Sequence, residues 1–220
     1  MERISTGSNI LDDFLEGGYE TDTITTIYGP AGSGKTNLVI LACVKSALIG
    51  KKIIFIDTEG SFSIERLKQL TPRYNEVLEN LLFIKPTNID EQQKIFEEVS
   101  KIKNFDLLII DTMTYLYRLR RVKNSIKEAN DSLAEQMSFL LELTRKKNIP
   151  VIITNQVYTD FENSQTRMLG GDIIGYASKC ILELQSFHKN RRKIILRKHR
   201  SIAGEKELYF QILNEGIALI

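Results

Sequence analysis

The sequence has 220 residues, of which 42% are hydrophobic, and a formal net charge of +2. A chain of this size buries one good core, so we expect a single α/β domain over residues 1–220. A charged N-terminus and the lack of any apolar run of membrane-spanning length exclude a signal peptide and a transmembrane segment, which predicts a cytoplasmic protein. The two cysteines, Cys43 and Cys180, lie far apart in the sequence, which indicates reduced core residues and not a metal site.

Strand-like and helical segments alternate through most of the chain. The segments expected to be strands are apolar and rich in β-branched residues, and they lie at 23–28, 52–57, 81–85, 105–111 and 149–156. The segments expected to be helices lie at 36–50, 63–70, 90–103 and 128–147. After Gly171 the pattern changes to three strand-like segments with short connections, at 179–186, 191–199 and 206–213. This order predicts a mostly parallel central sheet flanked by helices, with an antiparallel C-terminal extension at one edge.

Residues 28–37 read YGPAGSGKTN and fit the spacing G-x-x-x-x-G-K-[ST] of a phosphate-binding loop. The loop lies between a strand-like segment and a helical one, which is the context that this motif requires. Its glycines let backbone N–H groups point at a phosphate, Lys35 would reach the β- and γ-phosphates, and the Thr36 hydroxyl would ligate Mg²⁺. The residues expected to bind the nucleotide are Gly29, Pro30, Ala31, Gly32, Ser33, Gly34, Lys35, Thr36 and Asn37.

Polar residues end three other expected strands, at the edge where ligands of open α/β sheets bind. Asp111 ends FDLLIID and takes the position of the acid that holds Mg²⁺ together with Thr36, although a helix N-cap is the plainer alternative. Glu59 follows KIIFID and is the candidate to accept a proton from an attacking water, the alternative being a structural carboxylate. Gln156 ends VIITNQ in the corresponding place.

Positive charge is concentrated in one segment of the sequence. No acidic residue lies between Glu183 and Glu205, and the segment contains seven basic residues. Segregated positive charge favours a polyanionic partner such as nucleic acid, although a solvated hairpin would show the same pattern. The seven residues are Lys189, Arg191, Arg192, Lys193, Arg197, Lys198 and Arg200.

Four motifs resemble, in order and spacing, the ATPase core of the RecA/RadA-type recombinases. They are TGSNILDDFLEGGYETDTITTIYGPAGSGKT, FIDTEGSFSIERL, LLIIDT and VIITNQV, and the similarity covers essentially the whole chain. The resemblance implies a RecA-like fold, ATP and Mg²⁺ as ligands, and DNA as a partner. It also implies that Glu59 activates water and that Gln156 senses the γ-phosphate and couples it to a DNA-binding loop. Arg66 would stack on adenine, the alternative being a surface helix arginine.

Two segments match the DNA-binding loops of these recombinases. The first, YRLRRVKNSIKE, contains the basic residues Arg118, Arg120, Arg121 and Lys123. The second, 158–171, holds Asp160 and Glu162 beside Arg167, which makes it a poor phosphate binder. Asp172 stands where the family often has His after the paired glycines, so the coupling between DNA and hydrolysis stays open.

The sequence starts immediately before the recombinase core, whereas full recombinases carry an N-terminal helical DNA-binding domain and a linker that polymerises them. We therefore expect an accessory paralogue of the archaeal type that binds ATP and single-stranded DNA, hydrolyses ATP weakly, and assists a full recombinase and other recombination proteins in DNA repair. A homodimer is compatible with this expectation, and a long filament is not. Two alternatives stay open: a strand-exchange recombinase with DNA-stimulated ATPase, and a circadian-clock-like signalling ATPase without a DNA role.

The segment ILRKHRSIAG, residues 195–204, replaces a Pro-containing segment with which full recombinases cap a neighbour's nucleotide. Strand alternation would put Lys198 and Arg200 on one face, where they would contact DNA phosphates. Two alternatives are a cation that reaches across a subunit interface to a γ-phosphate, and a solvated hairpin tip with neither role. We expect the DNA role, with the contact residues Arg191, Arg192, Lys198, His199 and Arg200.

Overall fold

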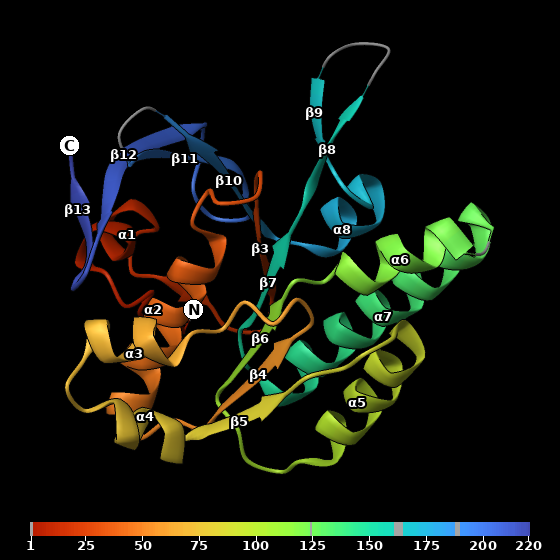
Figure 1. Cartoon of the computed structure of the whole chain (residues 1–220), viewed down its shortest axis with the longest axis horizontal. Helices are drawn as coiled ribbons and strands as arrows, with labels where there is room; N and C mark the ends of the chain where they lie inside the picture. Colours follow the sequence, from red (N-terminus) through yellow and green to blue (C-terminus); the bar gives the residue numbers. More distant parts are fainter. Residues whose placement is uncertain (1, 124, 161–164, 188–189) are drawn as a thin grey trace.

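The computed structural model of the chain describes residues 2–123, 125–160, 165–187 and 190–220, and no helix among them is both long and apolar enough to cross a membrane. Within these ranges a nine-stranded sheet runs through the molecule, and helices cover both of its faces (Figure 1). The strand order is β13-β12-β11-β10-β3-β7-β6-β4-β5.

The part of the sheet from β10 to β5 is parallel, because helical crossovers connect its strands. Its central strands are apolar along their whole length, as in the LLIID of β6, which is typical of strands covered on both faces. This half confirms the alternation predicted from the sequence. The bounds are β3 (Ile24–Tyr28), β4 (Ile53–Asp57), β5 (Leu81–Ile84), β6 (Leu107–Asp111), β7 (Val151–Asn155) and β10 (Cys180–Ser186).

Beyond β10 the sheet continues as an antiparallel meander, which confirms the predicted C-terminal extension. The strands are β11 (Arg191–His199), β12 (Lys206–Leu213) and β13 (Gly216–Leu219). The first two coincide with the expected segments. The third follows a tight turn and is only four residues long, too short for alternation to mark it in the sequence.

The helices form two layers, as the alternating side chains of β6 make clear. Leu107 and Ile109 pack into the core cluster that contains α2, whereas Leu108 and Ile110 pack into the cluster that contains α7. The α2 layer comprises α1 (Asn9–Phe14), α2 (Lys35–Leu48), α3 (Ile64–Leu70) and α4 (Tyr74–Glu79). The α7 layer comprises α5 (Ile89–Lys101), α6 (Tyr115–Lys123), α7 (Ile126–Lys147) and α8 (Gly171–Ala177).

Local capping residues set the ends of the longest helix. Ser125 accepts a hydrogen bond from the backbone N–H of Glu128 at 3.2 Å and so caps the start of α7. Three basic residues fill its last turn, next to the negative end of the helix dipole. Asn148 then adopts a left-handed conformation, with φ at 52°, and ends the helix.

Two short antiparallel pairs stand outside the main sheet. β1 (Arg3–Ile4) pairs with β2 (Tyr19–Glu20) near the N-terminus. β8 (Val157–Asp160) pairs with β9 (Gln165–Met168) and projects from the carboxyl end of β7 (Figure 1). The sequence predicted a loop over 158–171, and the structure has a hairpin there, because polar strands such as QTRM carry no hydrophobic alternation.

Two buried glutamines yield a stability prediction. Gln92 of α5 donates from Nε2 to Oε1 of Gln136 of α7 at 2.7 Å, and neither side chain reaches solvent. Replacing Gln136 with Leu leaves the Gln92 amide without this partner, which should lower the free energy of unfolding by about 1–3 kcal/mol. Replacing both with Leu removes both polar groups and should recover most of that loss. Urea denaturation measures both changes, and a double variant no more stable than the single one would contradict the account.

Candidate active site

The phosphate-binding loop joins β3 to α2 at the carboxyl edge of the sheet. Gly29 approaches β10 so closely that a Cβ there would lie 2.4 Å from the carbonyl oxygen of Leu184. Gly34 has a φ of 105°, which residues with a side chain rarely adopt, and it leads directly into the first turn of α2. The loop therefore ends at the positive end of a helix, which attracts anions.

Lys35 begins α2 and is only 8% exposed. Its Nζ donates to the carbonyl oxygens of Gly29 and Pro30, both at 2.9 Å. Burial lowers the pKa of the ammonium, and the carboxylates of Asp111 and Glu59 oppose that shift. A phosphate oxygen would be a stronger partner than either carbonyl, because both members of that hydrogen bond carry charge.

Asp111 ends β6 with a fully buried side chain. Its carboxylate accepts hydrogen bonds from Thr36 Oγ1 and Ser61 Oγ, both at 2.7 Å, and from Thr154 Oγ1. Thr36 and Asp111, expected to hold the metal, thus lie together and offer the oxygen ligands that Mg²⁺ prefers. In the described part of the chain, no three His, Cys, Asp or Glu side chains cluster so that they could hold a metal ion. The residues present therefore fit an ion whose remaining ligands are phosphate and water.

Glu59 lies in the turn after β4, and Asp57 fixes this turn. The Asp57 carboxylate accepts the backbone N–H groups of residues 59–62 at distances of 2.8–3.2 Å. Glu59 Oε1 accepts hydrogen bonds from Thr112 Oγ1 at 3.1 Å and from Gln156 Nε2. The carboxyl ends of β4, β6 and β7 therefore bring the proposed base and the proposed sensor into direct contact.

A cavity of about 490 Å³ lies over the phosphate-binding loop. Its volume is within the range of small-molecule sites. Asn37 Oδ1 is buried beside it without a hydrogen-bond partner in the described residues, which leaves an acceptor for a ligand. The lining residues are Ala31, Gly32, Gly34, Lys35, Thr36, Asn37, Glu59, Ser61, Thr112, Arg118, Gln156, Val157, Asn190, Arg192 and Ile212.

Arg66, expected to stack on adenine, is not among these lining residues. Its Nη1 donates to Gln69 Oε1 and to the carbonyl oxygen of Asn214, both at 3.0 Å. The second of these bonds ties α3 to the turn between β12 and β13. Its Nε and Nη2 are buried without partners in the described part of the structure. The adenine role stays a prediction.

The basic residues expected in the first DNA-binding loop lie on α6 and have different surroundings. They are Arg118, Arg120, Arg121 and Lys123. Arg118 lines the cavity over the phosphate-binding loop. Arg120 forms an ion pair with Asp90 of α5, and the guanidinium of Arg121 lies 5.8 Å from the ring centre of Tyr117. The side chain of the last of the four lies outside the described residues.

The β8–β9 hairpin is tied to the end of β7 and to the sensor residue Gln156, which follows that strand. Leu169 donates its N–H to the carbonyl oxygen of Gln156 at 3.0 Å, and Asn155 donates from Nδ2 to the carbonyl oxygen of Leu169 at 2.7 Å. A shift of Gln156 would therefore move the base of the hairpin. Glu162 and the side chain of Asp160, expected to weaken phosphate binding there, lie outside the described residues.

Acidic residues from elsewhere in the chain neutralise much of the basic segment. Lys193 pairs with Glu207, and Arg197 pairs with both Glu183 and Glu205. Arg192 lines the cavity, and Lys189 lies outside the described residues. Charge that is segregated in the sequence is therefore partly paired in the fold.

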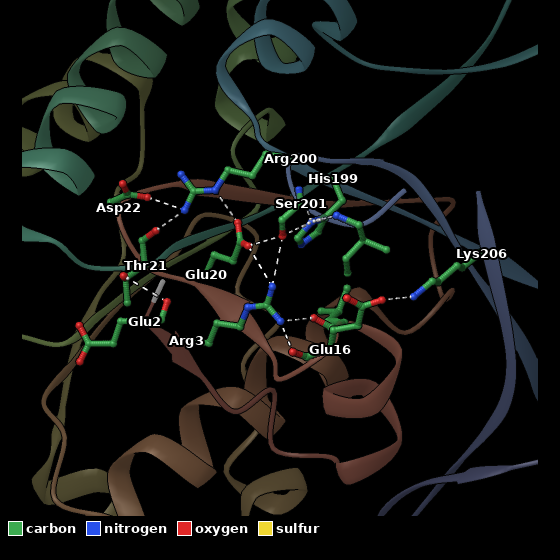
Figure 2. A network of polar contacts seen from close by, with 12 residues as sticks. Glu2, Arg3, Glu16, Glu20, Thr21, Asp22, His199, Arg200, Ser201 and Lys206 are labelled. Carbon is green, nitrogen blue, oxygen red and sulfur yellow. Dashed lines mark hydrogen bonds and ion pairs between the residues drawn. The ribbon is translucent and has the colours of Figure 1, made fainter. Parts of the chain in front are cut away.

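The end of β11 is held by a network that Figure 2 shows. Glu20 of β2 is 2% exposed and accepts hydrogen bonds from Arg3, Arg200 and Ser201. Arg200 Nη2 also pairs with Asp22 at 2.7 Å. β11 ends at His199, so the strand alternation expected to align Lys198 with Arg200 does not reach the arginine. We call the contacts among Arg3, Glu20, Asp22, Arg200 and Ser201 the hairpin anchor.

The two residues before Arg200 also have partners within the fold. Lys198 Nζ donates to the carbonyl oxygen of Gly175 at 2.8 Å. His199 Nδ1 accepts the N–H groups of Ser201 and Ile202 at 3.2 and 3.1 Å. Burial lowers the pKa of both side chains. Their DNA role stays a prediction, and a phosphate would have to compete with these contacts.

Four residues that position the site were not predicted as site residues from the sequence. They are Asp57, Ser61, Thr112 and Thr154. Asp57 had a usable signal, because an Asp followed by a Gly three residues later is typical of a turn closed by the carboxylate. The hydroxyl residues had no such signal, because their importance depends on which carboxylate they reach in the fold, Asp111 or Glu59.

The parallel sheet, the phosphate-binding loop, the buried acid of β6 and the Glu59–Gln156 pair define a RecA-like P-loop domain. The family model described as Rad51 matches residues 1–219. The DNA repair and recombination protein RadB of Methanococcus maripaludis is 38% identical over 214 residues, covering 96% of this chain and 98% of that protein. The protein of the same name from Methanobrevibacter smithii is 35% identical, covering 98% of this chain and 95% of that protein.

A solved structure agrees with these sequence matches. The crystal structure of the RadB recombinase superposes with a TM-score of 0.83 at 33% identity, over 99% of both chains. The chain belongs to the Rad51 family, in its RadB group of DNA repair and recombination proteins. This confirms the resemblance seen in the four sequence motifs. Family membership implies nucleotide and Mg²⁺ binding in general, and DNA and recombination proteins as partners.

The hairpin anchor yields a pH-dependent stability prediction. Burial raises the pKa of Glu20, but hydrogen bonds from Ser201 and Arg200 outweigh burial and leave the pKa below its usual value of 4.5. The charged carboxylate therefore stabilises the fold above that value, and the stabilisation is lost as the pH falls through the folded-state pKa. Glu20→Gln should lower the free energy of unfolding at pH 7 by about 1–3 kcal/mol.

Urea denaturation at pH 7 and pH 3 measures this effect, with Glu76→Gln as the control. Glu76 pairs with Arg73 on an exposed surface, where solvent screens the two charges and an ion pair contributes little to stability. The difference in the free energy of unfolding between wild type and Glu20→Gln should be smaller at pH 3 than at pH 7. A difference of the same size at both pH values would rule out the carboxylate charge as its source.

Proposed function

We propose that the chain binds ATP together with Mg²⁺, hydrolyses it slowly, and acts on DNA as an accessory to a full recombinase. The observation that carries this proposal is the convergence of functional groups on one cavity. Lys35, Thr36, Glu59 and Gln156 line it, and Asp111 bonds to the Thr36 hydroxyl. A lysine at the phosphates, a buried acid beside the metal-binding hydroxyl and a second carboxylate facing the cavity are the groups that water attack on ATP requires.

Each residue has a defined part in the proposed reaction. Lys35 exchanges the loop carbonyls for β- and γ-phosphate oxygens. Thr36 and Asp111 would hold Mg²⁺, which neutralises charge on the phosphate oxygens when it is bound. Glu59 orients a water toward the γ-phosphorus and accepts its proton, so that ADP and phosphate leave. Gln156 responds to the γ-phosphate through its contact with Glu59.

Slow turnover is proposed from the surroundings of the base. Glu59 Oε1 accepts hydrogen bonds from both Thr112 and Gln156. While both donors stay in place, the carboxylate has to accept the proton at its other oxygen, Oε2. A rearrangement at Gln156, which leads into the β8–β9 hairpin, would free Oε1 and speed hydrolysis.

DNA is proposed to bind between α6 and the β8–β9 hairpin, which flank the carboxyl edge of the sheet (Figure 1). Arg121 and the exposed Tyr158 line a hollow there, together with Asn130, Asp172 and the buried Tyr117. An exposed aromatic ring beside a guanidinium suits the stacking of unpaired bases, which favours single-stranded DNA.

The nucleotide assignment is tested with Lys35→Ala and Glu59→Gln. Lys35→Ala should weaken ATP binding about 10- to 150-fold, the loss expected for hydrogen bonds between charged groups. Glu59→Gln should bind ATP normally but lose about 10²–10⁴ in turnover, because its shape is kept and proton acceptance is lost. Titration calorimetry and phosphate release measure the two effects. Lys45→Ala, an exposed lysine on the same helix, is the control and should change neither.

Two outcomes would refute these roles. Wild-type ATP affinity in Lys35→Ala would reject the loop as the nucleotide site. Wild-type turnover in Glu59→Gln would reject the carboxylate as the base while leaving nucleotide binding intact.

The DNA surface is tested with Arg121→Ala. Loss of one phosphate contact should weaken binding of a single-stranded oligonucleotide and lower the salt slope of log K by about 0.7. Arg145→Ala is the matched control, because Arg145 is exposed near the other end of α7, roughly 28 Å along the helix axis from Ile126. Fluorescence anisotropy across a salt series gives both slopes. Equal slopes for the two variants would remove this face from the DNA surface.

A further inference from the structure

Arg192 of β11 points toward the phosphate-binding loop and not away from the molecule. Strand alternation puts it on the same face as Ile194 and Leu196, which pack into the core cluster of α2. Since α2 begins at the loop, the arginine that precedes these two core residues lies above the loop itself. Its Nη2 donates to the carbonyl oxygen of Gly32 at 3.2 Å.

The same guanidinium has an unused donor at the cavity. Arg192 Nε is buried and has no hydrogen-bond partner in the described residues, and the side chain lines the cavity over the loop. Buried donors in native proteins are almost always paired, so this one indicates an acceptor that comes from a ligand. A guanidinium offers several donors in one plane, a geometry that matches phosphate oxygens.

Residues near Arg192 form a packed wall on this side of the cavity. Asn190 Nδ2 donates to the carbonyl oxygen of Ile212 at 2.9 Å, which joins the start of β11 to β12. Ile212 packs over the loop so closely that a Cβ on Gly34 would lie 2.8 Å from its Cδ1. Asn190, Arg192 and Ile212 thus stand over the loop as one unit.

This wall lies on the opposite side of the loop from the proposed chemistry. The loop follows β3, and in the sheet β3 separates β11 and β12 from β7, β6 and β4. Glu59 and Gln156 extend from β4 and β7, where the γ-phosphate would lie. Arg192 therefore faces the part of the nucleotide that ADP and ATP share.

We propose that Arg192 is a nucleotide ligand supplied by the chain itself, which bonds to phosphate or ribose oxygens common to ADP and ATP. This role rests on the proposed function of the loop as an ATP site. It separates Arg192 from its neighbour Arg191, whose exposed side chain lies on the opposite face of β11. Of these two neighbouring arginines, both expected at DNA, only Arg191 is then left to contact it.

The test compares Arg192→Gln with Arg191→Gln in the full chain, because the two variants lose the same charge one residue apart. Affinities for ADP and ATP are measured by titration calorimetry, and affinity for a single-stranded oligonucleotide is measured in parallel. Arg192→Gln should weaken both nucleotides at least about tenfold, the lower end of the loss of a charged hydrogen bond, and leave DNA affinity unchanged. Arg191→Gln should leave both nucleotide affinities unchanged.

Lys35→Ala separates failure of this inference from failure of the ATP site. If Lys35→Ala loses nucleotide and the two arginine variants bind it equally well, Arg192 is not a ligand and the proposed function stands. If Lys35→Ala also binds normally, the proposed function fails first. A loss confined to ATP, or a loss of DNA affinity alone in Arg192→Gln, would also overturn the role. Thermal unfolding checks that each variant is folded. Arg192→Lys keeps a donor for the carbonyl oxygen of Gly32 and should bind nucleotide with intermediate affinity. It takes the place of Arg192→Gln in the test if the glutamine variant unfolds.

Discussion

The buried carboxylate of Asp111 is the interaction on which the arrangement of the site depends. It accepts hydrogen bonds from the hydroxyl groups of Thr36 at the start of α2, Ser61 in the turn after β4 and Thr154 in β7. A carboxylate at this depth costs several kcal/mol unless such donors surround it. Satisfying it fixes the phosphate-binding loop, the turn that carries Glu59 and the strand that precedes the sensor glutamine relative to one another.

The strand β11 connects the two charged regions of the molecule. At its end the hairpin anchor joins Arg200 to Glu20, and at its start Arg192 lies over the phosphate-binding loop. The anchor therefore limits how far β11 can shift, and with it the wall of the cavity. Much of the positive charge of this segment is paired within the fold, so the number of basic residues in the sequence overstates what β11 offers to DNA.

The sequence predicted the parts of the fold that depend on local pattern. Buried parallel strands, the loop motif and the strand-end positions of Asp111, Glu59 and Gln156 all follow from spacing along the chain. The hairpin anchor could not be predicted, because Glu20 and Arg200 are 180 residues apart and only the fold brings them together. The position of Arg192 could have been found, since alternation from Ile194 already indicates its face. The number of basic residues in the segment does not distinguish Arg192, which faces the cavity, from the arginines that face solvent.

A crystal structure of the chain with Mg²⁺ and a non-hydrolysable ATP analogue tests the central claim most directly. The account predicts the triphosphate in the cavity over the loop, with Lys35 Nζ moved from the carbonyls of Gly29 and Pro30 to phosphate oxygens. It also predicts the ion on Thr36 Oγ1, within one water of Asp111. An analogue bound elsewhere, or a Lys35 that keeps both carbonyls while the nucleotide is bound, would contradict the account.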